Sequence, residues 1–211
     1  MKNKISIIVG GSGQLGISLS KLLLNKNQNV VITTRNIISS KKKIPFKHKR
    51  LRLFKLDVLK KKQINFLLKK FNPDYIFYFA GQSSPNLSFN KKETTHLSNV
   101  TGCKNFLEIL QNHNFKTKFI NASSSEIFAE TSKKIKINSK KKPISPYGKA
   151  KLDSFNITKF YRQKKNLKTY NAIIFNTESF YRKIEYLIPK ICIAAINAKK
   201  YQKKTFFGNL D

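Results

Sequence analysis

The chain has 211 residues, of which 40% are hydrophobic and 25% charged, a composition that excludes collagen-like, disulfide-rich and wholly disordered proteins. It carries 43 basic residues against 10 acidic ones, a formal net charge of +33, but only five of the basic residues are arginine and the lysines are spread along the whole chain. Because arginine is the residue suited to base edges and bidentate phosphate contacts, we expect solvated basic faces and no nucleic-acid partner, with functional polyanion binding as the alternative.

Short apolar runs alternate with segments of helical period along the chain. The apolar runs predict strands over Ile5–Val9, Val30–Thr34, Leu51–Leu56, Tyr75–Ala80, Lys118–Ala122 and Tyr170–Phe175. The periodic segments predict helices over Gln14–Asn25, Lys60–Phe71, Thr94–Asn112, Pro146–Lys164 and Ile184–Lys199. Two segments rich in lysine and containing proline predict loops, Ser39–Arg50 and Thr131–Ser145. The alternation is typical of parallel βαβ units, so we predict an α/β protein with a Rossmann-type doubly wound parallel sheet and helices on both faces.

The cysteines and the hydropathy of the chain bear on its metal sites, disulfides and cellular location. Cys103 and Cys192 are far apart and neither belongs to a C-x-x-C pair, so neither a disulfide framework nor a metal site is expected. No apolar run approaches the ~20 residues that cross a bilayer. We therefore expect no membrane association and a cytoplasmic location.

A glycine-rich turn follows the first predicted strand directly. Gly10, Gly13 and Gly16 lie in this turn, which opens the first predicted helix together with Gln14 and Leu15. Glycine permits a tight turn, close approach of the backbone to a pyrophosphate and close packing of helix on strand, and the N–H groups at the helix start bind phosphates. Strand, turn and helix in this order predict a dinucleotide site; a glycine turn without a ligand is the alternative.

Two residues near the ends of the next two strands are candidates for binding the adenosine half of the dinucleotide. Arg35 follows the second predicted strand, where NAD-binding domains usually place a carboxylate for the ribose 2′-hydroxyl. Because a guanidinium pairs with a 2′-phosphate and a carboxylate repels it, we predict NADP as the cofactor; a solvent-facing arginine is the alternative. Asp57 follows the third strand and is either an acceptor for the adenine amino group or an ordinary loop aspartate.

Tyr147 and Lys151 form a Tyr-x-x-x-Lys pair in a predicted helix, where a spacing of four residues places both on one face. A tyrosine, with an ordinary pKa near 10, is a poor base at neutral pH, but a nearby ammonium favours the phenolate. Lys151 is also expected to hydrogen-bond the nicotinamide ribose. Because lysine is so abundant in this chain, the prediction of a catalytic pair depends on its place after the fifth strand and downstream of the glycine turn.

Hydroxyls and one carboxylate follow the fifth predicted strand. Ser124 and Glu126 would emerge at the carboxyl edge of the sheet, where ligands bind in such folds. Serines at strand ends often serve as caps or turns. Glu126 is one of only ten acidic residues, and its position beside a candidate tyrosine predicts a catalytic carboxylate.

Together these features resemble the extended short-chain dehydrogenase/reductases, and within them the GDP-mannose 4,6-dehydratase family. The resemblance covers essentially the whole chain. It rests on the glycine turn, Arg35, Phe79–Ser83, Ser88-Phe89, Ser124–Glu126, Ser145–Tyr147, Lys151, Asn176–Ser179 and the closing Gly208–Asp211. The chain departs from the family pattern at Leu15, Thr94, Thr177 and Tyr181.

The resemblance implies a set of binding residues. For the cofactor they are Gly10, Gly13, Gln14, Leu15, Gly16, Arg35, Asp57, Val58, Phe79, Ala80, Gly81, Gln82, Ser83, Lys151, Thr177 and Arg182. For the substrate they are Ser83, Ser124, Asn176 and Glu178.

The resemblance also implies a reaction, the conversion of GDP-mannose to GDP-4-keto-6-deoxy-mannose by NADP-mediated internal hydride transfer and loss of water. Tyr147 would take the C4 hydroxyl proton, Ser124 would hydrogen-bond the C4 oxygen, and Glu126 would take the C5 proton and assist loss of the C6 hydroxyl. Two alternatives are another nucleotide-sugar epimerase or dehydratase of the same fold, and an inactive cofactor-binding remnant.

The resemblance also implies a domain organisation. Residues 1–176 are expected to form the NADP-binding domain with the catalytic residues, and residues 177–211 the start of a substrate-binding region. Chains of the family continue past Asp211, so most of the small C-terminal substrate domain is expected to be missing. A homodimer or homotetramer is implied, paired through Thr94–Asn112 and Pro146–Lys164.

Overall fold

The computed structural model describes residues 3–113, 115–182 and 184–207. The closing segment Gly208–Asp211, on which part of the family resemblance rests, lies outside them. The chain divides into two compact units, Met1–Phe175 and Asn176–Asp211. The expected assignment of catalysis to residues 1–176 and of substrate binding to residues 177–211 stays a prediction.

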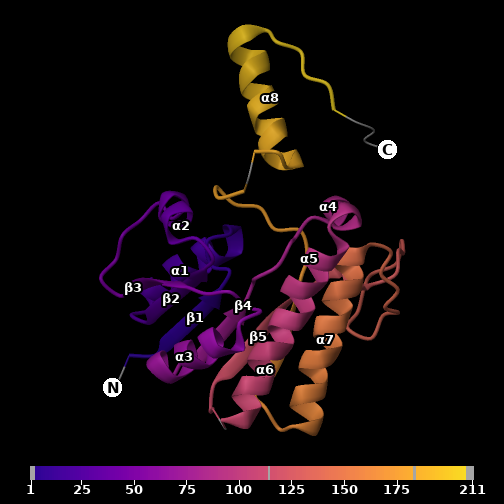
Figure 1. Cartoon of the computed structure of the whole chain (residues 1–211). Coiled ribbons are helices and arrows are strands. Elements are labelled where there is room, and N and C mark those ends of the chain that lie inside the picture. Colours follow the sequence, from indigo (N-terminus) through magenta and orange to yellow (C-terminus); the bar gives the residue numbers. More distant parts are fainter. Residues whose placement is uncertain (1–2, 114, 183, 208–211) are drawn as a thin grey trace. The chain divides into compact units, whose positions relative to one another are not determined.

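The first unit is built on a six-stranded sheet (Figure 1). Its strands are β1 (Ile5–Val9), β2 (Asn29–Thr34), β3 (Leu51–Lys55), β4 (Tyr75–Tyr78), β5 (Lys118–Ser124) and β6 (Thr169–Ile174). They lie in the order β3-β2-β1-β4-β5-β6, and every neighbouring pair is parallel. The order reverses between β1 and β4, the point at which ligands bind in open sheets of this kind. The predicted Rossmann-type doubly wound fold is confirmed.

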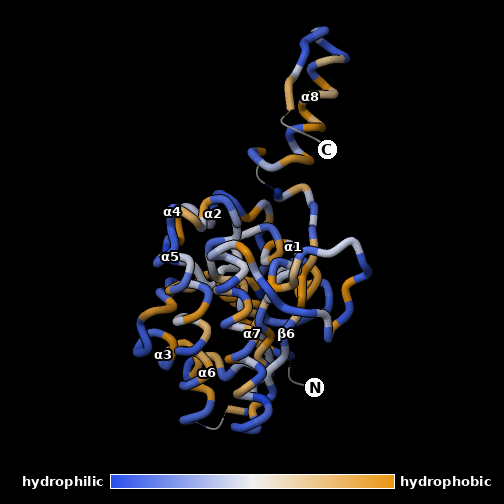
Figure 2. Tube along the Cα trace, turned by 90° about the vertical axis from the view of Figure 1, so that its right-hand side faces the viewer, coloured by the Kyte–Doolittle hydropathy of each residue, from blue (hydrophilic) through white to orange (hydrophobic). Residues whose placement is uncertain are grey.

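Helices cover both faces of this sheet. They are α1 (Gln14–Asn25), α2 (Ile37–Lys43), α3 (Lys61–Phe71), α4 (Pro85–Asn90), α5 (Lys92–His96), α6 (Gly102–Asn112) and α7 (Pro146–Lys164). A turn of π-helix, Leu97–Thr101, joins α5 to α6, and a turn of 3₁₀-helix, Ser125–Ile127, follows β5. In Figure 2, α3, α6 and α7 lie together to one side of β6.

The core lies between the central strands and α6. Tyr78 of β4 packs its ring against Phe106 of α6, with centroids 5.7 Å apart, and against Phe119 of β5 at 5.9 Å. All three side chains are fully buried. Burial of each such side chain stabilises the fold by roughly 1.5–3 kcal/mol. These contacts hold β4 and β5 against α6.

Both cysteines are free thiols in the structure. Cys103 is buried in this core, and burial raises the pKa of its thiol to about 12. At neutral pH it is a protonated, apolar core residue.

Several element boundaries differ from the prediction. A helix, α2, occupies the first part of the predicted loop Ser39–Arg50, because the Asn36 side chain accepts a hydrogen bond from the Ser39 N–H and caps it. The predicted strand Tyr75–Ala80 ends at Tyr78. The predicted helix over Thr94–Asn112 begins at Lys92 and contains the π-helical turn.

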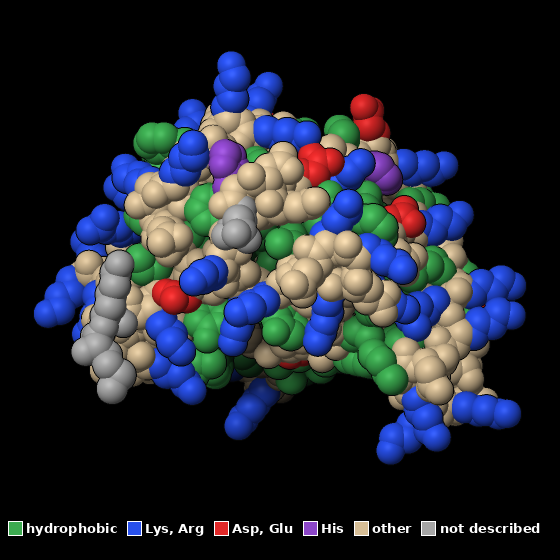
Figure 3. Space-filling model, turned by 90° about the horizontal axis from the view of Figure 1, so that it is seen from below, with side chains coloured by type: hydrophobic (Ala, Val, Ile, Leu, Met, Phe, Trp, Pro, Cys, Tyr) green, Lys and Arg blue, Asp and Glu red, His purple; other side chains and the backbone are tan. Residues whose placement is uncertain are grey.

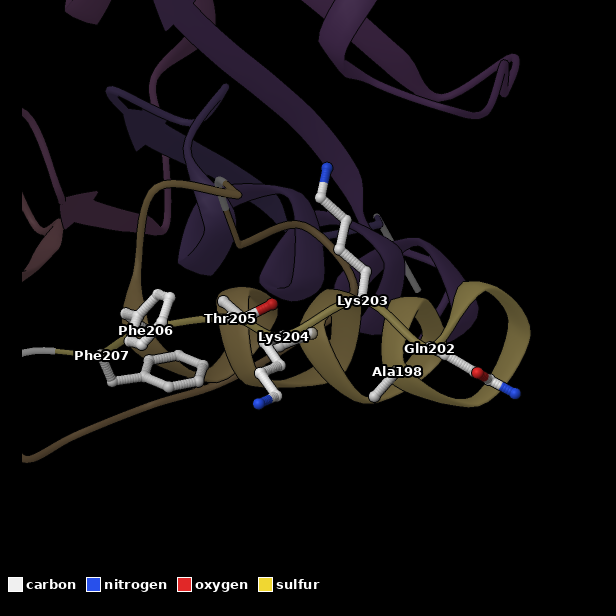
Figure 4. A pocket seen from close by; sticks show the side chains of 8 residues that line it. Ala198, Gln202, Lys203, Lys204, Thr205, Phe206 and Phe207 are labelled. Atoms are coloured by element: carbon white, nitrogen blue, oxygen red, sulfur yellow. The ribbon is translucent and has the colours of Figure 1, made fainter.

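The second unit contains one helix, α8 (Leu187–Tyr201), in place of the predicted Ile184–Lys199. None of the residues of α8 is buried. Figure 4 shows the segment that follows α8 running back along it, and the two line a concavity of about 550 Å³ with apolar and lysine side chains. None of the helices in the described part of the chain is long and apolar enough to span a membrane.

Basic side chains are dispersed over the surface. Figure 3 shows Lys and Arg side chains across the whole visible face, separated by apolar and uncharged groups. Glu108 of α6 pairs with Lys61 of α3 at 2.6 Å and with Lys104 at 3.8 Å. The choice between solvated basic faces and polyanion binding stays a prediction.

Candidate active site

The glycine turn connects β1 to α1 with backbone contacts that leave no room for side chains. Gly10 has φ +76°, and a Cβ added to it would lie 2.7 Å from the Ala80 Cα at the end of β4. A Cβ added to Gly16 would collide with the backbone of Gly11. The turn therefore packs tightly against β4 on one side and against the first turn of α1 on the other.

The space in front of α1 is open. Gly13 is the N-cap of α1 and makes no side-chain capping bond, and no acidic residue stands in the first turn. A Cβ added to Gly13 would meet only the Gly10 carbonyl oxygen, at 3.7 Å. Gln14 and Leu15 follow as half-buried residues. A helix start of this kind favours an anion, so the cradle fits a pyrophosphate.

The residues predicted to hold the adenosine half lie at the ends of β2 and β3. Arg35 is exposed directly after β2, and Asp57 and Val58 are half-buried after β3. The Asp57 Oδ1 accepts a hydrogen bond from the Leu59 N–H at 3.0 Å, and the Val58 carbonyl accepts one from Asn105. The Asp57 side chain thus braces its own loop, and its assignment to the adenine amino group stays a prediction.

The segment after β4 lies across the reversal point of the sheet. The Phe79 N–H donates to the Val9 carbonyl at 2.9 Å, which keeps Phe79 and Ala80 beside the end of β1. Gly81 has φ +148° and packs against the Asn99 side chain. Gln82 is half-buried and Ser83 is exposed. Of these predicted cofactor residues, Phe79 and Ala80 lie next to the glycine turn.

Asn99 holds the loop after β4, a role that no sequence pattern predicts. It lies in the π-helical turn, is buried, and donates from Nδ2 to the carbonyl oxygens of Gln82 and Thr95. Its role depends on contact with a loop 17 residues away. An asparagine inside a predicted helix carries no local signal of such a contact.

Tyr147 and Lys151 lie together on the buried face of α7, as the four-residue spacing predicts. The Lys151 Nζ is 5.7 Å from the centroid of the Tyr147 ring and donates a hydrogen bond to the Ala122 carbonyl at 2.7 Å. The two side chains are 8% and 7% exposed. Burial lowers the pKa of Lys151 from 10.5 to about 8, so its ammonium is retained at neutral pH in a poorly solvated place.

The start of α7 is held by two serines. Ser145 is the N-cap and accepts from the Gly148 N–H at 3.0 Å, and Ser88 of α4 accepts from the Tyr147 N–H, also at 3.0 Å. Ser88 is fully buried. Its segment contributes to the family resemblance, but sequence alone does not reveal that a residue 59 positions earlier binds the backbone of Tyr147.

Ser124 and Glu126 lie at the carboxyl end of β5. Ser124 is buried, and its Oγ accepts a hydrogen bond from the Glu126 N–H at 3.2 Å, which caps the 3₁₀ turn. The Glu126 side chain is exposed. A Cβ added to Gly148 would lie 2.6 Å from the Glu126 carbonyl oxygen. The first turn of α7 and the turn that carries Glu126 are therefore in direct backbone contact.

This contact predicts a large effect of Gly148→Ala. The added methyl group must push α7 away from the 3₁₀ turn, separating Tyr147 from Glu126, and displacement by about 1 Å can lower a catalytic rate by about 10²-fold. We expect the catalytic rate to fall at least tenfold, measured as the rate of product formation. Lys149→Ala, at the exposed neighbouring position, should keep the wild-type rate; equal rates for both variants would contradict the packing argument.

The predicted residues Asn176, Thr177, Glu178 and Arg182 belong to the second unit. Within it the Arg182 Nε is 3.6 Å from the Glu178 Oε1, and its guanidinium lies 3.7 Å above the ring of Tyr186. Their assignment to substrate and cofactor stays a prediction. Among the residues that the structure describes, no cluster of His, Cys, Asp or Glu side chains is arranged to hold a metal ion.

Solved structures share this architecture. A UDP-N-acetylglucosamine 4-epimerase from Methanobrevibacter ruminantium, in complex with UDP-N-acetylmuramic acid, superposes with a TM-score of 0.83 at 22% identity, covering 94% of this chain and 64% of that one. A dTDP-glucose 4,6-dehydratase from Streptomyces venezuelae, with NAD and TYD bound, gives 0.81 at 20% identity, covering 92% and 62%. At these identities the likeness establishes the fold.

Sequence comparison identifies the family. The chain is 29% identical to a GDP-mannose 4,6-dehydratase of Vibrio cholerae over 223 residues, and 29% identical to GDP-mannose 4,6 dehydratase 1 of Arabidopsis thaliana over 227. It spans about 60% of the length of these relatives, while they match 100% and 98% of it. The profile described as GDP-mannose 4,6 dehydratase matches residues 7–211. The chain therefore belongs to the GDP-mannose 4,6-dehydratase family.

Proposed function

We propose that this chain carries the cofactor-binding and catalytic part of an NADP-dependent GDP-mannose 4,6-dehydratase, a lyase that produces GDP-4-keto-6-deoxy-mannose. The observation that carries the proposal is the packing of α7 against the turn that follows β5. Tyr147 lies beside the Lys151 ammonium, and the helix that bears both contacts the turn that bears Glu126. The names of the relatives support the substrate.

The side chains divide the proton transfers between them. A bound nicotinamide dinucleotide would supply the chemistry of accepting and returning a hydride. Tyr147, with the Lys151 ammonium near its ring, takes the proton from the C4 hydroxyl, while Ser124 donates a hydrogen bond to the C4 oxygen. The C5 proton, acidified by the resulting ketone, passes to Glu126, which then assists departure of the C6 hydroxyl as water. The glycine turn and the first turn of α1 hold the pyrophosphate.

The test is incubation of the chain with NADP and GDP-mannose, with detection of a 4-keto-6-deoxy sugar by mass spectrometry. UDP- and dTDP-glucose serve as competing substrates, because several solved structures of this fold are UDP-sugar epimerases and one is a dTDP-sugar dehydratase. Product from GDP-mannose alone supports the proposal. Dinucleotide binding with no product from any sugar nucleotide would indicate a cofactor-binding protein without catalysis.

Cofactor choice is proposed to depend on Arg35. The exposed guanidinium at the end of β2 is suited to the 2′-phosphate of NADP, and a charge-assisted hydrogen bond contributes about 1.5–3 kcal/mol. We expect Arg35→Glu to raise the Kd for NADP by roughly 10- to 100-fold and to leave the Kd for NAD unchanged or lower, as measured by calorimetry. Arg52→Glu, at an exposed position on β3, is the control. An unchanged NADP affinity in Arg35→Glu would refute the assignment.

A further inference from the structure

The buried face of α7 is unusually polar. The side chains that form this stripe, at alternating spacings of four and three residues, are Tyr147, Lys151, Ser154, Thr158 and Tyr161. Ser154 is fully buried and Thr158 is 1% exposed. Aliphatic side chains usually occupy such a helix-on-sheet contact, whereas among the buried residues of α7 only Ala150 has one. The catalytic pair and the two hydroxyls therefore share one polar line.

Side chains from two strands reach this line. Asn121 of β5 is 1% exposed, and its Nδ2 donates to the Asn171 Oδ1 of β6 at 3.0 Å and to the Ser154 Oγ at 3.4 Å. Asn171 in turn donates from Nδ2 to the Phe155 carbonyl of α7 at 3.0 Å. We call Asn121, Ser154 and Asn171 the amide–hydroxyl clamp. It ties α7 to both strands at one level.

The clamp is continuous with the catalytic lysine. The Ser154 Oγ donates to the Lys151 carbonyl at 3.1 Å, so the clamp grips the turn of α7 that begins at Lys151. Lys151 itself donates to the carbonyl of Ala122, the residue next to Asn121. Two neighbouring residues of β5 thus anchor α7. The backbone carbonyl of Ala122 binds the Lys151 ammonium, and the side chain of Asn121 binds Ser154.

The energetics indicate what such a clamp does. On burial, polar groups exchange their hydrogen bonds with water for hydrogen bonds within the protein, so their net contribution to stability is small. Replacing all partners by apolar groups of similar shape is therefore often nearly neutral. Apolar contacts are non-directional and tolerate small rotations and slips, whereas these bonds have narrow ranges of distance and angle. The clamp therefore restricts the rotation and the axial position of α7 more than it stabilises the fold.

We propose that Asn121, Ser154 and Asn171 are positioning residues that set the register of α7 on the sheet and so place Tyr147 and Lys151 at the carboxyl end of β5. This inference rests on the proposed dehydratase function, since it assigns the residues a part in that reaction. None of the three touches the reacting atoms; each acts through the helix.

The test replaces the whole clamp by apolar residues, in the triple variant Asn121→Leu, Ser154→Ala and Asn171→Leu. We expect kcat to fall at least about tenfold, as a misplaced catalytic pair implies, and the pH–rate profile to shift along the pH axis, while the Kd for NADP changes little. Thr117→Val is the matched control. It removes a buried hydroxyl that donates to the Pro73 carbonyl at 2.7 Å, away from α7, and it should lower Tm without moving the pH profile.

A second readout does not need turnover. Lys151→Met is introduced into the wild type and into the triple variant, and the change in Tm at pH 7 is compared. In the wild type, the change in Tm caused by Lys151→Met measures the effect on stability of burying the Lys151 ammonium against β5. If the clamp sets the register of α7, the change should shrink in the triple variant. Should the triple variant not fold, Asn171→Leu alone, which leaves the Asn121–Ser154 bond, carries the same comparison.

The outcomes separate the two proposals. A wild-type chain that forms no product, with a smaller Lys151→Met effect in the triple variant, would defeat the proposed function and leave the clamp standing. A triple variant with wild-type kcat, pH profile and Lys151→Met effect would overturn the clamp whatever the substrate.

Discussion

Tyr147→Phe should lower kcat for conversion of GDP-mannose by at least about 10³-fold, since positioned general acid–base groups contribute roughly 10²- to 10⁴-fold. The ring remains, so packing of the buried side chain is preserved. Loss of rate with an unchanged Kd for NADP would locate the defect in proton transfer. The measurement is product formation by mass spectrometry over hours.

The matched control is Tyr161→Phe, on the same buried stripe of α7. Burial raises the pKa of Tyr161, so its hydroxyl stays protonated, and it has no part in the proposed reaction. Its removal should leave kcat within about twofold, the range expected of a group that makes no transition-state contact. If both phenylalanine variants lost activity alike, or if Tyr147→Phe kept it, Tyr147 would not be the base.

Glu126 is the proposed base for the C5 proton. With Glu126→Gln, product should disappear and deuterium from solvent should no longer enter at C5, because no group remains to take that proton.

Lys151→Met should abolish activity and yet make the folded chain more stable at pH 7. The pKa of Lys151 is about 8 in the folded chain and ordinarily 10.5, a difference equivalent to about 3 kcal/mol at 1.36 kcal/mol per unit. Below pH 8 both folded and unfolded chains hold the proton, and the full cost of the buried ammonium is present. Between pH 8 and 10.5 the unfolded chain binds more protons, so the unfolding free energy of the wild type rises with pH.

Methionine removes this cost, although it also gives up the hydrogen bond to Ala122. We therefore expect a gain of roughly 1–3 kcal/mol in urea unfolding at pH 7, shrinking as pH rises through the window from 8 to 10.5. Lys149→Met, at the exposed neighbouring position, should show neither the gain nor its pH dependence. A variant less stable than the wild type at pH 7 would mean that the contacts of Lys151 outweigh its desolvation.

The sequence predicted the fold where local patterns dominate. The bounds of α1 and α7 agree residue for residue with the predicted segments. Gly13 marks the start of α1 and Ser145 the start of α7, and each helix keeps a helical period along its length. α2 was missed because its seven residues have no apolar period and depend on one capping bond from Asn36. The π-helical turn was missed because nothing local distinguishes it from the helix around it.

For the site, spacing predicted the adjacency of Tyr147 and Lys151. The contact of the glycine turn with Ala80 follows from the order of the strands in the folded sheet. The parts that no sequence pattern predicts are contacts between distant segments. Ser88 binds the backbone of Tyr147 across 59 residues, and Asn121 binds Asn171 across 50. Such pairs arise only when the helices and strands pack together.

The polar stripe of α7 also has a consequence for how the gene can change in length. Inserting or deleting one codon between Tyr147 and Thr158 would turn every later side chain by about 100° around the helix axis, moving the hydroxyls out of reach of their strand partners. The lysine-rich stretch at residues 131–144 carries no such constraint, because it forms no helix or strand. Across descendants of this gene, that stretch is where gains and losses of codons can accumulate, while the span from Tyr147 to Thr158 keeps a constant count.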